Sequence, residues 1–135
     1  YGFSGEAPTL EDIKELTPQK VIPVYYGEFW KHAAFSEIRN QSIANFLFSR
    51  ACNSGISPAI KCAQRAIWAI FRDRKKVAED GILGAETIAI LNSLFVDDVL
   101  AAIRCETAGD YRCIVAHDQS QQTHINGWLN RAYER

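Results

Sequence analysis

The chain has 135 residues and a mass of 15.2 kDa, of which 47% are hydrophobic and 23% charged; this suffices for one domain with its own core and excludes a disordered, collagen-like or low-complexity protein. Lys and Arg number 15 and Asp and Glu number 16, so the net charge of -1 provides no basic excess for gripping nucleic acid. The longest apolar run, residues 66–71, is far too short to cross a bilayer.

The amino-terminal region predicts a loop and two short helices. The chain starts at Tyr1, contains no methionine and shows no secretion signal. This start suggests a processed or truncated chain, so the absence of a signal is uninformative. Residues 1–8 read as a loop, and residues 10–16 as a short helix. Thr17 and Pro18 are typical of a helix start, and we expect Pro23 to tighten or kink that helix.

Two longer helices are expected in the middle of the chain. Residues 36–52 are apolar around much of the circumference, which indicates a buried central helix. Residues 53–55 (Asn-Ser-Gly) tolerate positive φ and predict its end. A new helix should begin at Ser57 and Pro58, and Gln64 shares its apolar face.

The carboxyl-terminal half predicts three more helices. A charged run at residues 72–76 indicates a solvated helix end, and the Asp-Gly turn at residues 80–84 should have Ile82 and Leu83 tucked inward. The expected elements are a helix at residues 85–94, a helix capped by Asp97 or Asp98 and weakened by Gly109, a polar linker at 118–123 and a last helix at 125–133. No strand-like alternation of useful length is present, so the sequence predicts an all-α protein of six or seven helices.

The cysteines and histidines do not predict a metal site. Cys52, Cys62, Cys105 and Cys113 lack the two-residue gap of a zinc knuckle, and we interpret them as small apolar residues on helices. A Cys52–Cys62 disulfide remains open if the protein matures outside the cytosol. The three histidines, at positions 32, 117 and 124, show no metal-ligand spacing and are expected on the surface.

A dense aromatic cluster surrounds residues 25–30. Tyr25 and Phe29 are expected in the core because their spacing is helical, whereas Tyr26 and Trp30 lie on the neighbouring stripe and could line a groove. Aromatic faces in grooves stack on sugar rings or bases. The alternative for Trp30 is ordinary core packing.

An ordered series of motifs covers nearly the whole chain and carries a family resemblance. The motifs are Tyr1-Gly2-Phe3-Ser4, Leu16-Thr17, Tyr26 with Phe29-Trp30, Asn53-Ser54-Gly55, Ala63-Gln64, Asp80-Gly81-Ile82-Leu83-Gly84 with Thr87, and Gly127-Trp128-Leu129-Asn130-Arg131. This succession resembles glycoside hydrolase family 108, the phage-type N-acetylmuramidases, with their attached predicted peptidoglycan-binding region. Pro23 and residues 105–122 depart from the pattern.

The resemblance implies a lysozyme-like enzyme that cleaves the glycan strand of peptidoglycan by general acid catalysis. It implies one all-α domain over residues 1–135, with a lysozyme-like part at about 1–72 and a peptidoglycan-binding part at about 73–135. The family's acid is a glutamate in a Glu-Gly-Gly motif upstream of the segment that matches Tyr1, so no catalytic residue is assigned here. The chain's own candidates all have simpler structural explanations: Glu6, Glu11, Glu28, Glu37, Asp80 and Glu86.

The resemblance also implies a substrate cleft. Tyr1 should lie near the sugar, Trp30 should offer a stacking face, and Asn53 and Gln64 should donate or accept amide hydrogen bonds. The implied partner is a peptidoglycan glycan strand held by a monomer, without nucleic acid or membrane insertion. The resemblance implies that neither a metal nor an organic cofactor is required. The implied location is bacterial or prophage cytoplasm before release, then the periplasm or cell wall.

Two other classes of function stay open at this point. The chain could be a peptidoglycan-binding domain without catalysis. It could also be an all-α adaptor or regulator whose basic run at residues 72–76 contacts protein or nucleic acid. The second class predicts salt-sensitive binding to DNA and none to murein.

Overall fold

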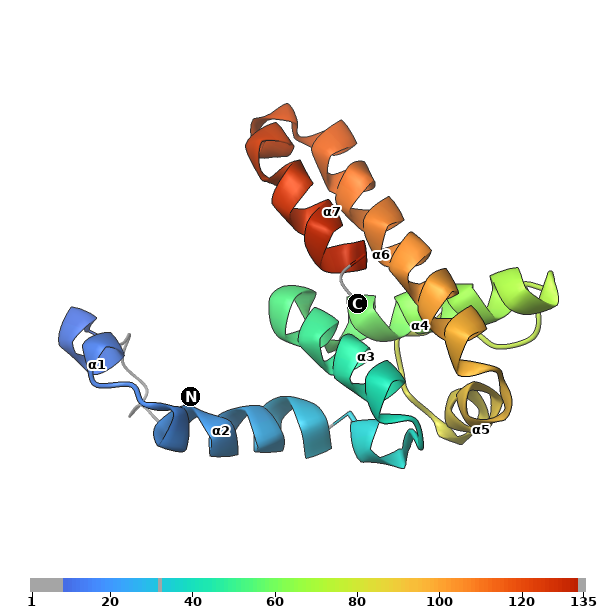
Figure 1. The fold of residues 1–135 in the computed structure, drawn as a ribbon, viewed down its shortest axis with the longest axis horizontal. Helices are drawn as coiled ribbons and strands as arrows, with labels where there is room; N and C mark the ends of the chain where they lie inside the picture. Colours follow the sequence, from blue (N-terminus) through green and yellow to red (C-terminus); the bar gives the residue numbers. More distant parts are fainter. Residues whose placement is uncertain (1–8, 32, 134–135) are drawn as a thin grey trace.

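The computed structural model describes residues 9–31 and 33–133, and this part of the chain is helical without any strand (Figure 1). The all-α prediction is therefore confirmed. A π-helical turn (Tyr26–Lys31) and two 3-10 helices (Phe35–Glu37 and Gln119–His124) connect the α-helices. The α-helices are α1 (Leu10–Lys14), α2 (Pro18–Tyr25), α3 (Gln41–Ser54), α4 (Ile56–Phe71), α5 (Ala85–Ser93), α6 (Val96–His117) and α7 (Ile125–Tyr133).

The main core lies where α4 packs against both α3 and α6 (Figure 1). Its largest side chains are fully buried and come from distant parts of the sequence, including Phe35, Leu47, Ile67 and Ile103. Burial of this apolar surface is the main source of stability for such a bundle. None of the described helices combines the length and the apolar character that crossing a lipid bilayer requires.

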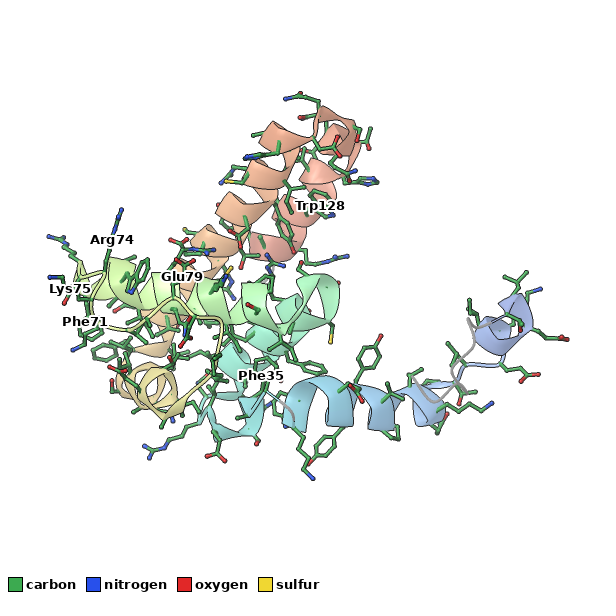
Figure 2. The ribbon with its side chains drawn as sticks, turned by 180° about the vertical axis from the view of Figure 1, so that it is seen from behind. Phe35, Phe71, Arg74, Lys75, Glu79 and Trp128 are labelled. Carbon is green, nitrogen blue, oxygen red and sulfur yellow. The ribbon has the colours of Figure 1, made fainter. Side chains whose placement is uncertain are left out.

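A second, smaller core joins α6 and α7, which form an antiparallel hairpin that projects from the bundle (Figure 1). Tyr111 and Ala132 are buried there, and Trp128 packs against them between the two helices (Figure 2). The rings of Tyr111 and Trp128 lie 5.5 Å apart, centroid to centroid. The predicted last helix is thus amphipathic as expected, and α6 supplies its partner.

At the other end of the chain, α1 and α2 form an arm that extends away from the bundle (Figure 1). No residue of α2 is buried. Thr17 is the residue before its first turn, as predicted, although its side chain makes no capping hydrogen bond. The helix continues through Pro23 and passes into the π-helical turn, where the chain meets the bundle.

Several predicted boundaries were wrong by a few residues. The central helix α3 starts at Gln41 instead of residue 36, because Asn40 accepts a hydrogen bond from the backbone N–H of Ile43 at 3.1 Å and caps it there. Phe95 and not an aspartate precedes α6, and Asp97 and Asp98 occupy its first turn. Gly109 does not interrupt α6, and the predicted polar linker forms a 3-10 helix instead.

Ion pairs of Arg65 link α4 to α6 and to the loop that follows α4. Its guanidinium donates to Glu79 at 2.7 Å, to Glu106 at 2.9 Å and to Asp110 at 2.8 Å. The thiol of Cys62 donates to Asp110 at 3.1 Å. Burial and this carboxylate raise the pKa of Cys62 to about 11, so the thiol stays protonated and unreactive at neutral pH.

All four cysteines are free, so the Cys52–Cys62 disulfide that the sequence left open is not formed. Cys62 is buried within α4, whereas Cys105 and Cys113 are exposed. Within residues 9–31 and 33–133, no group of His, Cys, Asp and Glu side chains is arranged to hold a metal ion.

Candidate functional site

The Asp-Gly turn is held in place by Gln64, which projects from α4. Its amide nitrogen lies 2.9 Å from Oδ1 of Asp80, 3.1 Å from the carbonyl oxygen of Ile82 and 3.4 Å from Oγ1 of Thr87. Its amide oxygen accepts from the backbone N–H of Gly81 at 3.0 Å. With 1% of its surface exposed, Gln64 anchors this turn and offers no open surface to a ligand.

Glycine is required at position 81. Its φ is +72°, in the left-handed region, and a Cβ atom there would lie 2.2 Å from Oγ of Ser57. Leu83 is buried as predicted, but the prediction for Ile82 was wrong because its side chain is exposed. The turn motif is therefore explained by packing and hydrogen bonding.

Asp80 should make the turn more stable above pH 4 than below it. Hydrogen bonds from the Gln64 amide and from the backbone N–H of Ile82 lower the pKa of Asp80. A lowered folded pKa adds stability above the unfolded value of about 3.9, and this stability is lost as the pH falls through the folded pKa. Asp80→Asn should therefore lower the urea midpoint at pH 7, and the difference from wild type should shrink below pH 4. Glu11→Gln, which removes an exposed carboxylate of α1, should show no such trend; an equal Asp80→Asn effect at both pH values would contradict the argument.

An apolar hollow of about 560 Å³ lies between α3 and the end of the amino-terminal arm. We call it the aromatic hollow; its lining residues are Ile22, Tyr25, Tyr26, Trp30, Asn45, Phe48, Ser49 and Cys52. Trp30 is half-buried and lies against Phe48 in an edge-to-face arrangement, with ring centroids 5.5 Å apart. Tyr26 keeps 57% of its surface exposed. The hollow thus presents aromatic rings that are accessible on one side and pack against other side chains on the other side.

Polar side chains of α3 form a ridge beside the aromatic hollow. The polar ridge consists of Ser42, Asn45, Ser49 and Asn53, which are all exposed and follow one face of the helix. Asn45 and Ser49 line the aromatic hollow and also a second hollow on the other side, between α3, α6 and α7. Hydroxyl and amide groups next to aromatic faces are the combination that binds neutral sugars, whose rings have apolar faces and polar edges.

The four predicted site residues fall in three different settings. Trp30 lines the aromatic hollow and Asn53 lines the second hollow, and the two hollows flank the polar ridge. Gln64 is buried under the Asp-Gly turn, away from both hollows. Tyr1 lies outside the described residues. The glycan contacts of all four stay predictions. Of the three that the structure describes, Trp30 and Asn53 have the open surface that such a contact needs.

Sequence reasoning missed other residues of these surfaces. Tyr25, expected in the core, is exposed and lines the aromatic hollow, because the arm that carries it leaves the bundle. Arg50, Arg104 and Arg131 line the second hollow. Arg50 could have been found, because it continues the buried stripe of Ile43 and Leu47 at helical spacing, where a charge is unusual.

The basic run at residues 72–76 lies far from both hollows. Arg74 and Lys75 point outward at the end of α4, on the side of the molecule opposite α2 (Figure 2). The ammonium of Lys76 sits 4.4 Å from the centre of the Phe71 ring. The run is a solvated helix end and loop, as the sequence predicted.

The structure thus defines an all-α protein with a polar ridge between two hollows, and the comparisons assign its family. The family described as "Predicted Peptidoglycan domain" matches residues 58–133, more than half of the chain. The chain belongs to this family. No curated protein matches it.

A structural comparison extends the similarity of fold over almost the whole chain. The structure of Brucella abortus SagA matches with a TM-score of 0.66, covering 93% of this chain and 68% of that chain at 18% sequence identity. At this identity the likeness shows a shared fold alone. The expected link to peptidoglycan is confirmed by the family match, whereas membership of glycoside hydrolase family 108 and the division near residue 72 stay predictions.

Proposed function

We propose that this chain holds a peptidoglycan glycan strand along the polar ridge and aromatic hollow, as part of an N-acetylmuramidase. The observation that carries the binding role is the aromatic hollow itself, in a chain whose family is tied to peptidoglycan. Tyr25, Tyr26 and Trp30 would stack on sugar rings, and Asn45 and Ser49 would hydrogen-bond N-acetyl and hydroxyl groups. Asn53 would extend these contacts along α3.

The catalytic part of the proposal needs a carboxylic acid that is still protonated near neutral pH beside the glycosidic oxygen. None of the described side chains that line the two hollows is a carboxylic acid. Asp80 is unsuited, because its lowered pKa keeps it ionised. In an enzyme of the kind that the sequence resembles, glycoside hydrolase family 108, the acid would be the glutamate of a Glu-Gly-Gly motif that precedes the segment matching Tyr1.

The lack of carboxyl groups among the described residues that line the two hollows favours a second candidate, a domain that binds peptidoglycan without cleaving it. Both candidates share the same glycan surface and need no metal or organic cofactor. Both place the protein, as a monomer, at the cell wall or in the periplasm, after a cytoplasmic stage in a bacterium or prophage. They differ only in whether the complete gene product releases reducing sugar ends from purified murein.

Cosedimentation with purified murein sacculi tests the shared glycan surface. Tyr26→Ala and Trp30→Ala should each weaken binding about five- to tenfold, as expected when a stacking contact of roughly 1–1.4 kcal/mol is lost. Tyr26 is the safer variant for folding, because more than half of its side chain is exposed, whereas Trp30 packs on Phe35 and Phe48.

The matched control is Tyr133→Ala, which removes an exposed tyrosine of α7 that lines neither hollow. It should bind sacculi like the wild type. Wild-type binding that Tyr26→Ala leaves unchanged would rule out the aromatic hollow. If the complete gene product binds murein but releases no reducing ends, the enzyme proposal fails and the binding domain remains.

A further inference from the structure

We propose that the second hollow, between α3, α6 and α7, binds a carboxylate group, and that its ligand is the stem peptide of peptidoglycan. We call it the arginine hollow; it encloses about 360 Å³. The choice of peptide rests on the proposed function, whereas the preference for a carboxylate rests on the hollow alone. The lining residues that carry the argument are Arg50, Asn53, Arg104, Thr107, Tyr111 and Arg131.

The hollow contains buried donors without acceptors. Arg50 is only 4% exposed; its Nη2 donates to Asp110 at 3.2 Å, but its Nε and Nη1 have no hydrogen-bond partner among the described residues. The same is true of Nε of Arg104 and of Oγ1 of Thr107. Buried polar atoms are costly unless something satisfies them, so native structures rarely leave several together without a reason. An oxygen-rich anion in this hollow would bring acceptors of the kind that these donors lack.

Aromatic rings hold two of these guanidinium groups in place. Arg50 lies over the ring of Tyr111, with 5.0 Å from Cζ to the ring centre, and Arg104 lies over the ring of Phe46 at 5.8 Å. A planar guanidinium fixed in this way presents paired N–H groups that match the two oxygens of a carboxylate. Arg131 adds a third positive charge from the exposed face of α7.

The charges of the hollow are not balanced by acids within it. None of the described lining residues is acidic. The nearest carboxylate partner, Asp110, is already shared by Arg50, Arg65 and the Cys62 thiol. Three arginines and one shared carboxylate thus leave the hollow locally positive on a chain whose net charge is only -1, which favours an anionic ligand here.

The position of the hollow favours the stem peptide as the source of the carboxylate. Asn45 and Ser49 line both hollows, so a sugar in the aromatic hollow would have its substituents above the polar ridge. The stem peptide branches from the muramic acid sugar and carries free carboxylates. Arg104, Thr107, Tyr111 and Arg131 lie within residues 58–133, the part that matches the peptidoglycan-related family.

Calorimetric titration with two forms of one peptide tests the proposal. The probes are N-acetyl-L-Ala-γ-D-Glu-L-Lys-D-Ala with free carboxylates and the same peptide with these carboxyls amidated. The wild-type chain should bind the free acid about tenfold more tightly, because charge-assisted hydrogen bonds are lost on amidation. Arg104→Gln and Arg131→Gln should each remove most of this difference. Arg74→Gln, an exposed arginine at the far end of α4, should leave it unchanged.

Each alternative result overturns the proposal. Equal affinity for the two peptides excludes a carboxylate site, and full selectivity in both Arg104→Gln and Arg131→Gln excludes this hollow. Tighter binding of inorganic phosphate than of the free-acid peptide would mark a phosphate site instead.

A neutral probe separates this inference from the proposed function. Chitotetraose carries no carboxylate, so its binding should depend on Tyr26 and not on Arg131. A chain that binds the free-acid peptide but no chitotetraose refutes the glycan surface and leaves the carboxylate site standing. A chain that binds chitotetraose but has equal affinity for the two peptides refutes the carboxylate site and leaves the glycan surface standing.

Discussion

Replacing Phe35 with alanine is expected to lower the free energy of unfolding by about 3–5 kcal/mol, the usual range for removing a buried aromatic ring. Phe35 has no exposed surface and lies inside the bundle (Figure 2). Its ring centroid is 6.1 Å from that of Trp30 and 6.2 Å from that of Phe48. The substitution would leave a cavity at the point where three aromatic rings meet. Urea unfolding followed by circular dichroism measures the loss.

The same variant should also weaken binding to murein sacculi, because Trp30 and Phe48 line the aromatic hollow and rest on Phe35. The matched control is Phe95→Ala, in which the ring is 83% exposed and the loss should be at most about 0.5 kcal/mol. A Phe35→Ala loss below 1 kcal/mol would show that the three rings do not form a cooperative core.

Gln64→Leu is expected to cost about 2–4 kcal/mol, since a buried donor or acceptor that loses its partner costs roughly 1–3 kcal/mol. The substitution keeps an apolar stem of similar size but leaves the backbone N–H of Gly81 without its acceptor. It also removes the donor to Asp80, Ile82 and Thr87. Urea unfolding measures the cost, and faster proteolysis at residues 80–84 would show that the turn has loosened.

Gln19→Leu serves as the control, because Gln19 is exposed on α2 and the change there should stay within about 0.5 kcal/mol. A stable Gln64→Leu protein with impaired glycan binding would reverse the interpretation. That result would support the glycan contact that the resemblance implied for Gln64, and it would contradict the role of Gln64 in stabilising the turn.

Local sequence signals predicted the helices well where caps and breakers are strong. The Asn-Ser-Gly stop at residues 53–55 and the restart before Pro58 lie where α3 ends and α4 begins. The helix predicted at residues 85–94 corresponds to α5, Ala85–Ser93. The start of α3 was misplaced because a 3-10 turn carries the same apolar pattern as a first helical turn, and only the Asn40 cap separates them.

The candidate site was less accessible to sequence reasoning. Helical spacing placed Trp30 on a different stripe from Tyr25. It does not reveal that the amino-terminal arm leaves the bundle, so that Tyr25 and Tyr26 are both exposed. The resemblance implied one cleft for Asn53 and Gln64, but Asn53 lines the second hollow and Gln64 faces the Asp-Gly turn. A polar side chain on the apolar face of a helix indicates that this side chain has a hydrogen-bond partner in the fold. The sequence does not tell which residue that partner is.

The sequence by itself determined the helical class, most helix ends and the link to peptidoglycan, because these depend on spacing, caps and motifs within short stretches of chain. Only the tertiary structure decided which surfaces face one another. Arg50, Arg104 and Arg131 are 54 and 27 residues apart along the chain, and they line one hollow because α6 packs against both α3 and α7. Packing between elements that are distant in the sequence brings such charges close together, and no local sequence pattern predicts this proximity.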